Sequence, residues 1–134
     1  MRLIRTEAAP APVDGAPYSQ AVVAEPGEMV FVSGQLGIDP QTGALVGEGV
    51  REQTIVVLRH LATILAAAGA RMEDVVTTTV YLTDLAGDFG AMNEVYAVAF
   101  ARHAPARATV GVAALPLGAR VEIGAVAVIG AVAL

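Results

Sequence analysis

The chain has 134 residues and a formal net charge of −5, from eight basic and 13 acidic side chains. Cys and Lys are both absent, which excludes disulfides, thiolate metal sites, cysteine nucleophiles, Schiff-base lysines and a P-loop lysine. The acidic balance argues against a nucleic-acid partner, and the presence of only two histidines argues against a histidine metal site. No apolar run is long enough to cross a membrane and no signal-peptide pattern begins the chain, so we expect a cytoplasmic protein without membrane partners.

Six runs rich in β-branched and apolar residues, bounded by Gly, Pro or polar turn residues, are predicted to be strands. They are residues 3–5, 20–24, 29–33, 75–83, 108–113 and 120–129. The last strand belongs to an apolar segment, residues 123–134, that we interpret as a buried strand followed by a tail.

Two segments are predicted to be helices. The first spans about residues 50–68 and ends at Gly69, and the second begins with Asp88 as its N-cap and ends before Pro105. In the first, apolar side chains recur on one face of a 3.6-residue period, at Val57, Leu58, Leu61, Leu65 and Ala68. The order of elements predicts one α+β domain over residues 1–134, with two helices packed on one face of a mixed sheet.

The apolar content exceeds what such a small domain needs for its own core. Hydrophobic residues make up 55% of the chain and charged residues 16%, compared with roughly 45–50% and 25% in an average soluble protein. Much of this content is small, because 27 residues are Ala. The second face of the sheet is also apolar and no third helix is available to cover it, so we expect another subunit there.

Arg107 is the polar residue that most clearly indicates a binding site. It begins an otherwise apolar strand, directly after Pro105 and Ala106. A partly buried Arg needs a partner, which is either a structural carboxylate of the same chain or the carboxylate of a substrate. The planar guanidinium suits bidentate binding of a substrate carboxylate, and the residues alone leave both alternatives open.

Several separated motifs match one known pattern in the same order. Residues 15–21 read G-A-P-Y-S-Q-A, which is similar to a G-P-Y-S-Q-A signature with one inserted residue. The other matching segments are S-G-Q-L-G-I-D-P-Q-T-G at 33–43, V-Y-L-T-D at 80–84, N-E-V-Y at 93–96, P-A-R at 105–107 and L-P-L-G-A at 115–119. Together they resemble the Rid family, once labelled endoribonuclease L-PSP, over about residues 3–129.

The resemblance implies a chorismate-mutase-like fold and a homotrimer whose sheets form a central barrel, with ligand clefts between subunits. It also implies hydrolysis of reactive 2-imino or enamine acids to 2-oxo acids and ammonia, without a metal or organic cofactor. In this chain Arg107 would clamp the carboxylate of a small-molecule substrate. Tyr18 and Ser33 would line the cleft, Asn93 would lie near it, and Thr109 would offer its backbone N–H where many members have Cys.

One position departs from the family pattern. The family commonly reads V-E-I-E-A-I-A near its C-terminus, whereas residues 121–127 read V-E-I-G-A-V-A, so the Glu credited with positioning the attacking water is Gly124. A positioned acid or base contributes about 10²–10⁴-fold, so we expect reduced or altered activity. Gly124 would also enlarge the cleft. Glu122 lies on the same strand face, roughly 6–7 Å away along the strand, and is the remaining candidate for a catalytic carboxylate.

Two other functions stay open. The first is a trimer that binds 2-oxo acids or other carboxylates, or acts in regulation, without catalysis. The second is the ribonuclease of the old family label, against which the net charge of −5 and the absence of Lys both argue.

Overall fold

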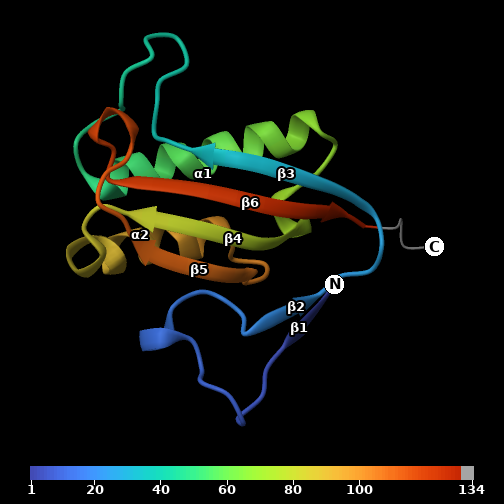
Figure 1. Cartoon of the computed structure of the whole chain (residues 1–134). Coiled ribbons are helices and arrows are strands. Elements are labelled where there is room, and N and C mark those ends of the chain that lie inside the picture. Colours follow the sequence, from blue (N-terminus) through green and yellow to red (C-terminus); the bar gives the residue numbers. More distant parts are fainter. Residues whose placement is uncertain (131–134) are drawn as a thin grey trace.

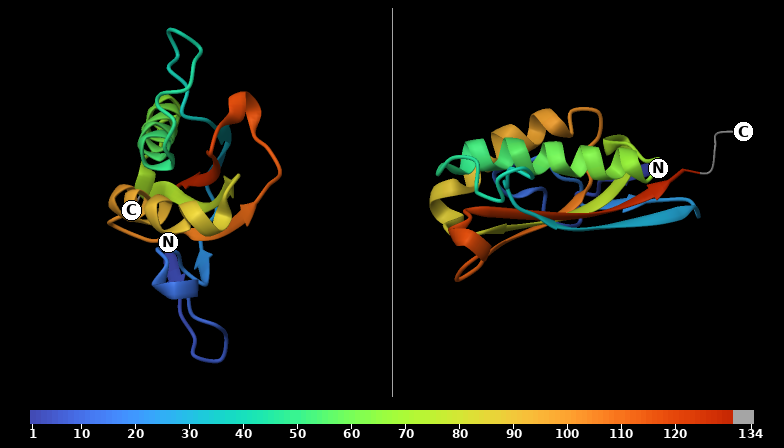
Figure 2. Two further views of the ribbon diagram at one scale, coloured as in Figure 1. Left: turned by 90° about the vertical axis from the view of Figure 1, so that its left-hand side faces the viewer. Right: turned by 90° about the horizontal axis from the view of Figure 1, so that it is seen from above.

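A four-stranded sheet with two helices on one face forms the body of the protein (Figures 1 and 2). The computed structural model describes residues 1–130, so the expected C-terminal tail and the end of the expected single domain lie outside the described residues. The sheet contains β3 (Glu28–Gln35), β4 (Val75–Leu82), β5 (Ala106–Gly111) and β6 (Val121–Ile129), and the helices are α1 (Val50–Ala67) and α2 (Leu85–Ala99). No helix in this part of the chain has both the length and the apolar content needed to cross a bilayer.

The sheet is mixed, as predicted. Its strand order is β3-β6-β4-β5, with β6 antiparallel to both neighbours and β4 parallel to β5. The parallel pair is joined by α2, which is the usual crossover connection for parallel strands. The two short N-terminal strands, β1 (Arg2–Ile4) and β2 (Ala21–Val23), pair antiparallel as a separate small sheet (Figure 1).

The core lies between the helices and one face of the sheet. Alternate residues of β4 and β6 are buried there, as expected for strands with one covered face. α1 contributes four of the five apolar side chains predicted from its periodicity, while Ala68 is exposed and forms the C-cap. The fully buried large side chains include Leu61, Leu65, Val80, Leu82, Met92, Tyr96, Val121 and Ile123.

Within residues 1–130, neither α-helix lies on the opposite face of the sheet (Figure 2). Phe31 is 70% exposed there and Met29 is 56% exposed, and β5 adds Val110 at 41%. These exposed apolar side chains agree with the apolar second face expected from the sequence, and the polar residues Thr79 and Glu122 share this face with them.

The predicted start of the second helix is wrong by one turn. α2 begins at Leu85, and Asp84 is its N-cap, because the Asp84 carboxylate accepts a hydrogen bond of 3.0 Å from the Gly87 N–H. Asp88 instead lies within the first turn, is 6% exposed, and accepts two hydrogen bonds from Arg120. Asp88 therefore acts as the ion-pair partner of Arg120, 32 residues away, and not as a helix cap.

Candidate functional site

The Arg107 side chain lies on the helix-covered side of β5, beside Thr78 of β4 in the strand register. Three aromatic rings surround its guanidinium carbon, at 4.8 Å from the ring centre of Tyr96, 5.2 Å from Tyr18 and 5.9 Å from Phe89. Each distance is within the range of a cation–π contact. Phe89 and Tyr96 come from one face of α2, two turns apart, so the helix and the segment before β2 form an aromatic cage around the cation.

Burial lowers the pKa of the Arg107 guanidinium, whereas Tyr96 and Tyr18 act in the opposite direction. The group still stays protonated, because an Arg side chain remains charged in proteins. Its Nε and Nη2 atoms are buried without a hydrogen-bond partner in the described part of the chain, and Nη1 lies 4.0 Å from the sulfur of Met92. The intrachain carboxylate that was one alternative for Arg107 is therefore not found within residues 1–130. Buried donors without acceptors are unfavourable, so the cage favours an anionic ligand that can reach them.

A hollow of about 430 Å³ adjoins the cage. One of its walls is the turn η1 (Val13–Gly15), and the Val13 N–H donates a 2.9 Å hydrogen bond to the Tyr18 hydroxyl, which ties this turn to the aromatic ring. The hollow is lined by Val13, Asp14, Tyr18, Leu85, Ala86, Phe89, Arg107 and Thr109. The structure therefore brings together Tyr18, Arg107 and Thr109, three of the residues expected in the site.

Two further polar atoms are buried without a partner among the described residues. They are the Oγ1 of Thr109, two residues after Arg107 on β5, and the Oδ1 of Asn93, one turn after Phe89 on α2. Asn93 is half-buried and lies on the helix that supplies the cage. Buried polar atoms are normally paired, so their cluster on these two elements makes the region a candidate for a polar binding site.

Glu122 and Gly124 lie on the other, helix-free face of the sheet. They share a hollow of about 280 Å³, whose lining includes Gly34, Thr79 and Tyr81. The Glu122 carboxyl group lies over Gly34, since a Cβ built on Gly34 would be 2.7 Å from Glu122 Cδ. Ser33 is exposed on β3 next to Gly34. In one chain, the expected site residues therefore form two groups on opposite faces of the sheet.

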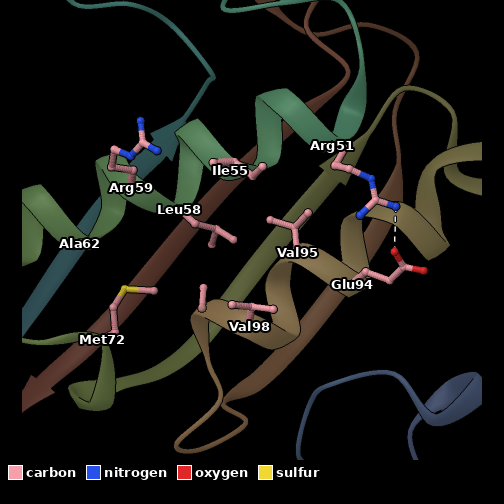
Figure 3. A pocket seen from close by; sticks show the side chains of 10 residues that line it. Arg51, Ile55, Leu58, Arg59, Ala62, Met72, Glu94, Val95 and Val98 are labelled. Carbon is pink, nitrogen blue, oxygen red and sulfur yellow. Dashed lines mark hydrogen bonds and ion pairs between the residues drawn. The ribbon is translucent and has the colours of Figure 1, made fainter.

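A third hollow, of about 470 Å³, lies between α1 and α2 on the outer surface (Figure 3). Three charged residues line it, of which Arg51 and Glu94 form an ion pair of 2.7 Å with each other and Arg59 is exposed. The remaining lining is mostly apolar, with Ile55, Leu58, Ala62, Met72, Val95, Val98 and Ala99. None of the buried polar atoms that lack a partner among residues 1–130 lines this hollow, so the hollow at Arg107 is the better candidate for a functional site.

The sequence did not identify the aromatic cage or the Asp88–Arg120 ion pair. Phe89 and Tyr96 belong to the apolar face of the second predicted helix, and this spacing is equally typical of core residues. Their rings lie next to Arg107 only because α2 packs over β5 in the folded protein. The Asp88–Arg120 pair gives no local signal, because its residues lie 32 positions apart.

The architecture and the caged Arg define a small α+β protein with a candidate site for an anion. Among known proteins, the family described as Endoribonuclease L-PSP matches residues 6–129 of this chain. The chain belongs to this family, which is the one that the sequence motifs resemble.

Named relatives lie close to this chain. It is 49% identical to the 2-iminobutanoate/2-iminopropanoate deaminase of Rattus norvegicus over 129 residues, covering 96% of this chain and 90% of the relative. The crystal structure of RidA from an Antarctic Psychrobacter is 45% identical, with a TM-score of 0.73, and the match covers 96% of this chain and all of that chain. Escherichia coli TdcF with bound serine is 40% identical, with a TM-score of 0.70, covering 96% and 98% of the two chains.

Proposed function

We propose that this protein hydrolyses reactive 2-imino or enamine acids to 2-oxo acids and ammonia. The observation that carries the proposal is the caged Arg107 cation, whose buried donors lack an acceptor within the described residues and which lines an open hollow. The rat relative is named a deaminase of two such imines, and the relative TdcF is described with bound serine, an amino acid that carries a carboxylate.

The proposed reaction needs few protein groups. Arg107 would bind the substrate carboxylate, while a water molecule adds to the imine carbon, the C–N bond breaks and ammonia leaves, so that the imine and water give the 2-oxo acid and ammonia. Tyr18 and Thr109 would line the cleft, with Asn93 beside it. Glu122 is the proposed group that accepts a proton from water, with the turnover reduced because residue 124 is Gly. No metal or cofactor takes part in this scheme.

We further propose a homotrimer with a central barrel and clefts between subunits, in the chorismate-mutase-like arrangement. The exposed apolar side chains of the helix-free face support this proposal, since Phe31 and Met29 would become buried in it. A subunit boundary would also join the two groups of site residues, because Glu122 and Gly124 of one chain could face Arg107 of its neighbour. The proposed location is the cytoplasm, with no nucleic-acid or membrane partner.

The direct test is removal of Arg107. 2-Iminopropanoate, generated in situ by an amino-acid oxidase, should disappear faster with the wild-type protein than with Arg107→Ala. Arg59→Ala, which removes an exposed Arg of α1, is the matched control and should keep the wild-type rate. A wild-type rate no higher than that of Arg107→Ala would contradict the proposal.

A second candidate is a trimer that binds 2-oxo acids without catalysis, and Gly124 is the observation that favours it. Binding of pyruvate without imine turnover in the wild-type protein, combined with turnover in Gly124→Glu, would support this reading. The family's ribonuclease label has less support, because phosphate contacts are built from Lys and Arg and this chain has no Lys and a net charge of −5.

A further inference from the structure

The turn η1 carries a carboxylate into the hollow that contains Arg107. Asp14, in the middle of this turn, lines the hollow, and its side chain makes no hydrogen bond or ion pair with residues 1–130. The turn directly precedes Ala16 within the G-A-P-Y-S-Q-A segment, which has one residue more than the family signature that it resembles. Ala16 is 7% exposed and anchors the segment, whereas Val13, Asp14 and Gly15 are exposed, so the turn lies at the solvent side of the hollow.

The backbone of this turn is unusual. Asp14 has φ 52° and Gly15 has φ 66°, so two consecutive residues adopt the left-handed conformation. Gly adopts it readily, and Asp and Asn are among the few other residues that tolerate it. The conformation alone could therefore explain an Asp at position 14, and any role for its charge must be separated from this preference.

The other residues that line the hollow would suit an elongated ligand. Arg107 and Asp14 place opposite charges on its lining, and apolar side chains from Val13, Leu85 and Phe89 share that lining. A volume of about 430 Å³ also leaves room for more than a two- or three-carbon acid. A ligand with a carboxylate, an aliphatic stem and a cationic end would satisfy all three features, because such stems cover apolar surface while their charged end stays at the solvent.

We infer that Asp14 is a specificity-determining residue that favours 2-imino acids with a positively charged side chain. This inference rests on the proposed function, since it uses Arg107 as the carboxylate clamp. The substrate carboxylate lies at Arg107, its methylene groups lie along the apolar wall, and its cationic end faces Asp14.

A matched pair of ligands tests the inference by binding. One is a 2-oxo acid whose side chain ends in a trimethylammonium group, which cannot cyclise onto the oxo carbon, and the other is its uncharged isostere ending in a tert-butyl group. Calorimetry with the wild-type protein at low salt should give a Kd ratio of about three to five in favour of the cation, as for a partly exposed charge pair. The ratio should fall as salt is added.

Asp14→Asn is the decisive variant, because Asn keeps the left-handed preference and removes the charge. Its Kd ratio should be close to one, with binding of the uncharged ligand unchanged. A variant that folds and keeps the wild-type ratio would overturn the inference, as would a wild-type protein that does not distinguish the two ligands. Asp14→Gly, which also suits the left-handed backbone, should behave like Asp14→Asn and provides a second uncharged variant.

Turnover separates this inference from the proposed function. The imines of the two corresponding amino acids, generated in situ by an oxidase, should show the same preference in kcat/KM. If neither imine is hydrolysed while the Kd ratio still depends on Asp14, the deaminase proposal fails and charge selection by the site stands. If both imines are hydrolysed with the same kcat/KM, in the wild type and in Asp14→Asn alike, the deaminase proposal stands and the inference about Asp14 is wrong.

Discussion

The hydroxyl groups of Tyr96 and Thr78 lie 2.7 Å apart in the buried layer between α2 and the sheet. The same Tyr96 ring is the nearest aromatic neighbour of the Arg107 guanidinium, at 4.8 Å. One hydrogen bond between a helix and a strand therefore fixes the ring on which the candidate substrate clamp rests. The folding core and the site share this residue, which links the stability of the protein to the orientation of Arg107.

Tyr96→Phe should lower the free energy of unfolding by about 1–2 kcal/mol, because it keeps the ring but leaves the buried Thr78 hydroxyl without its partner. Urea unfolding measures this loss. The double variant Tyr96→Phe/Thr78→Val should be closer to wild type than the sum of the single variants, since both polar groups are then removed. Strictly additive losses would show that the two hydroxyls are not coupled.

The buried phenol also predicts how stability depends on alkaline pH. Burial, partly offset by the Thr78 hydrogen bond and by Arg107, raises the pKa of Tyr96 from 10.0 to about 12. The folded state thus holds its proton more tightly than the unfolded state, so the stabilisation is complete below pH 10 and is lost as pH rises toward 12. The expected loss is about 2–3 kcal/mol.

Titration of unfolding free energy between pH 9 and 12 measures this effect, with Tyr96→Phe as the control that should lack it. The chain suits the experiment because it has no Lys, whose ionisation would otherwise fall in the same range. A wild-type curve that runs parallel to that of Tyr96→Phe would exclude Tyr96 as the cause.

The Asp88–Arg120 ion pair should stabilise the fold more than the exposed Arg51–Glu94 pair. Arg120 donates to both carboxylate oxygens of Asp88, at 2.8 and 3.0 Å, and Asp88 is 6% exposed. Hydrogen bonding to Asp88 raises the pKa of Arg120, which is the direction expected for such a pair. Arg120→Ala leaves a buried carboxylate without its partner, so its melting temperature should fall clearly below that of Arg51→Ala.

The matched variant Arg51→Ala should change stability by less than about 1 kcal/mol, because its ion pair is more than half exposed on both sides. Thermal unfolding of both variants under the same conditions makes the comparison. Equal losses from the two substitutions would show that the burial of Asp88 has no energetic consequence.

Local sequence patterns predicted most of the fold because its elements carry strong local signals. The apolar period of α1 and the β-branched runs of β4 and β6 are each long enough to be recognised from the sequence alone. The start of α2 was harder, since Asp84 and Asp88 are both acceptable N-caps, and Asp88 is drawn into a different role by two hydrogen bonds from the distant Arg120. The residues near Asp88 in the sequence do not reveal a partner that is 32 residues away.

The candidate site was predictable only in part. Motif resemblance supplied Arg107 and Tyr18, but the cage depends on where α2 lies over β5, which is a nonlocal arrangement. The same holds for Glu122, because the strand order β3-β6-β4-β5 decides which strands lie beside it and separate it from Arg107. Spacing along the sequence gives the strand face but not the neighbouring strands.

Glu122→Gln should lower kcat for imine hydrolysis by about 10²-fold if this carboxylate is the group that accepts a proton, because Gln has the same shape and cannot do so. The substitution should have little effect on stability, since Glu122 is on the helix-free face and has no ion-pair partner within residues 1–130. Steady-state kinetics with 2-iminopropanoate measures the effect. A kcat within twofold of wild type would assign the proton transfer to another group.

Gly124→Glu should raise kcat by about 10²-fold, because it restores the carboxylate that the family pattern places at this strand position. The backbone can accept the side chain, since a Cβ at Gly124 would lie 3.4 Å from the Val32 carbonyl oxygen and 3.6 Å from the Gly34 nitrogen, both ordinary contacts. Gly124→Gln is the matched control, because it fills the cleft to the same extent without supplying an acid or base. Equal rates for the two variants would mean that the cleft works without a carboxylate at position 124. A gain confined to Gly124→Glu would show that the missing carboxylate at position 124 is the cause of a slow wild-type enzyme.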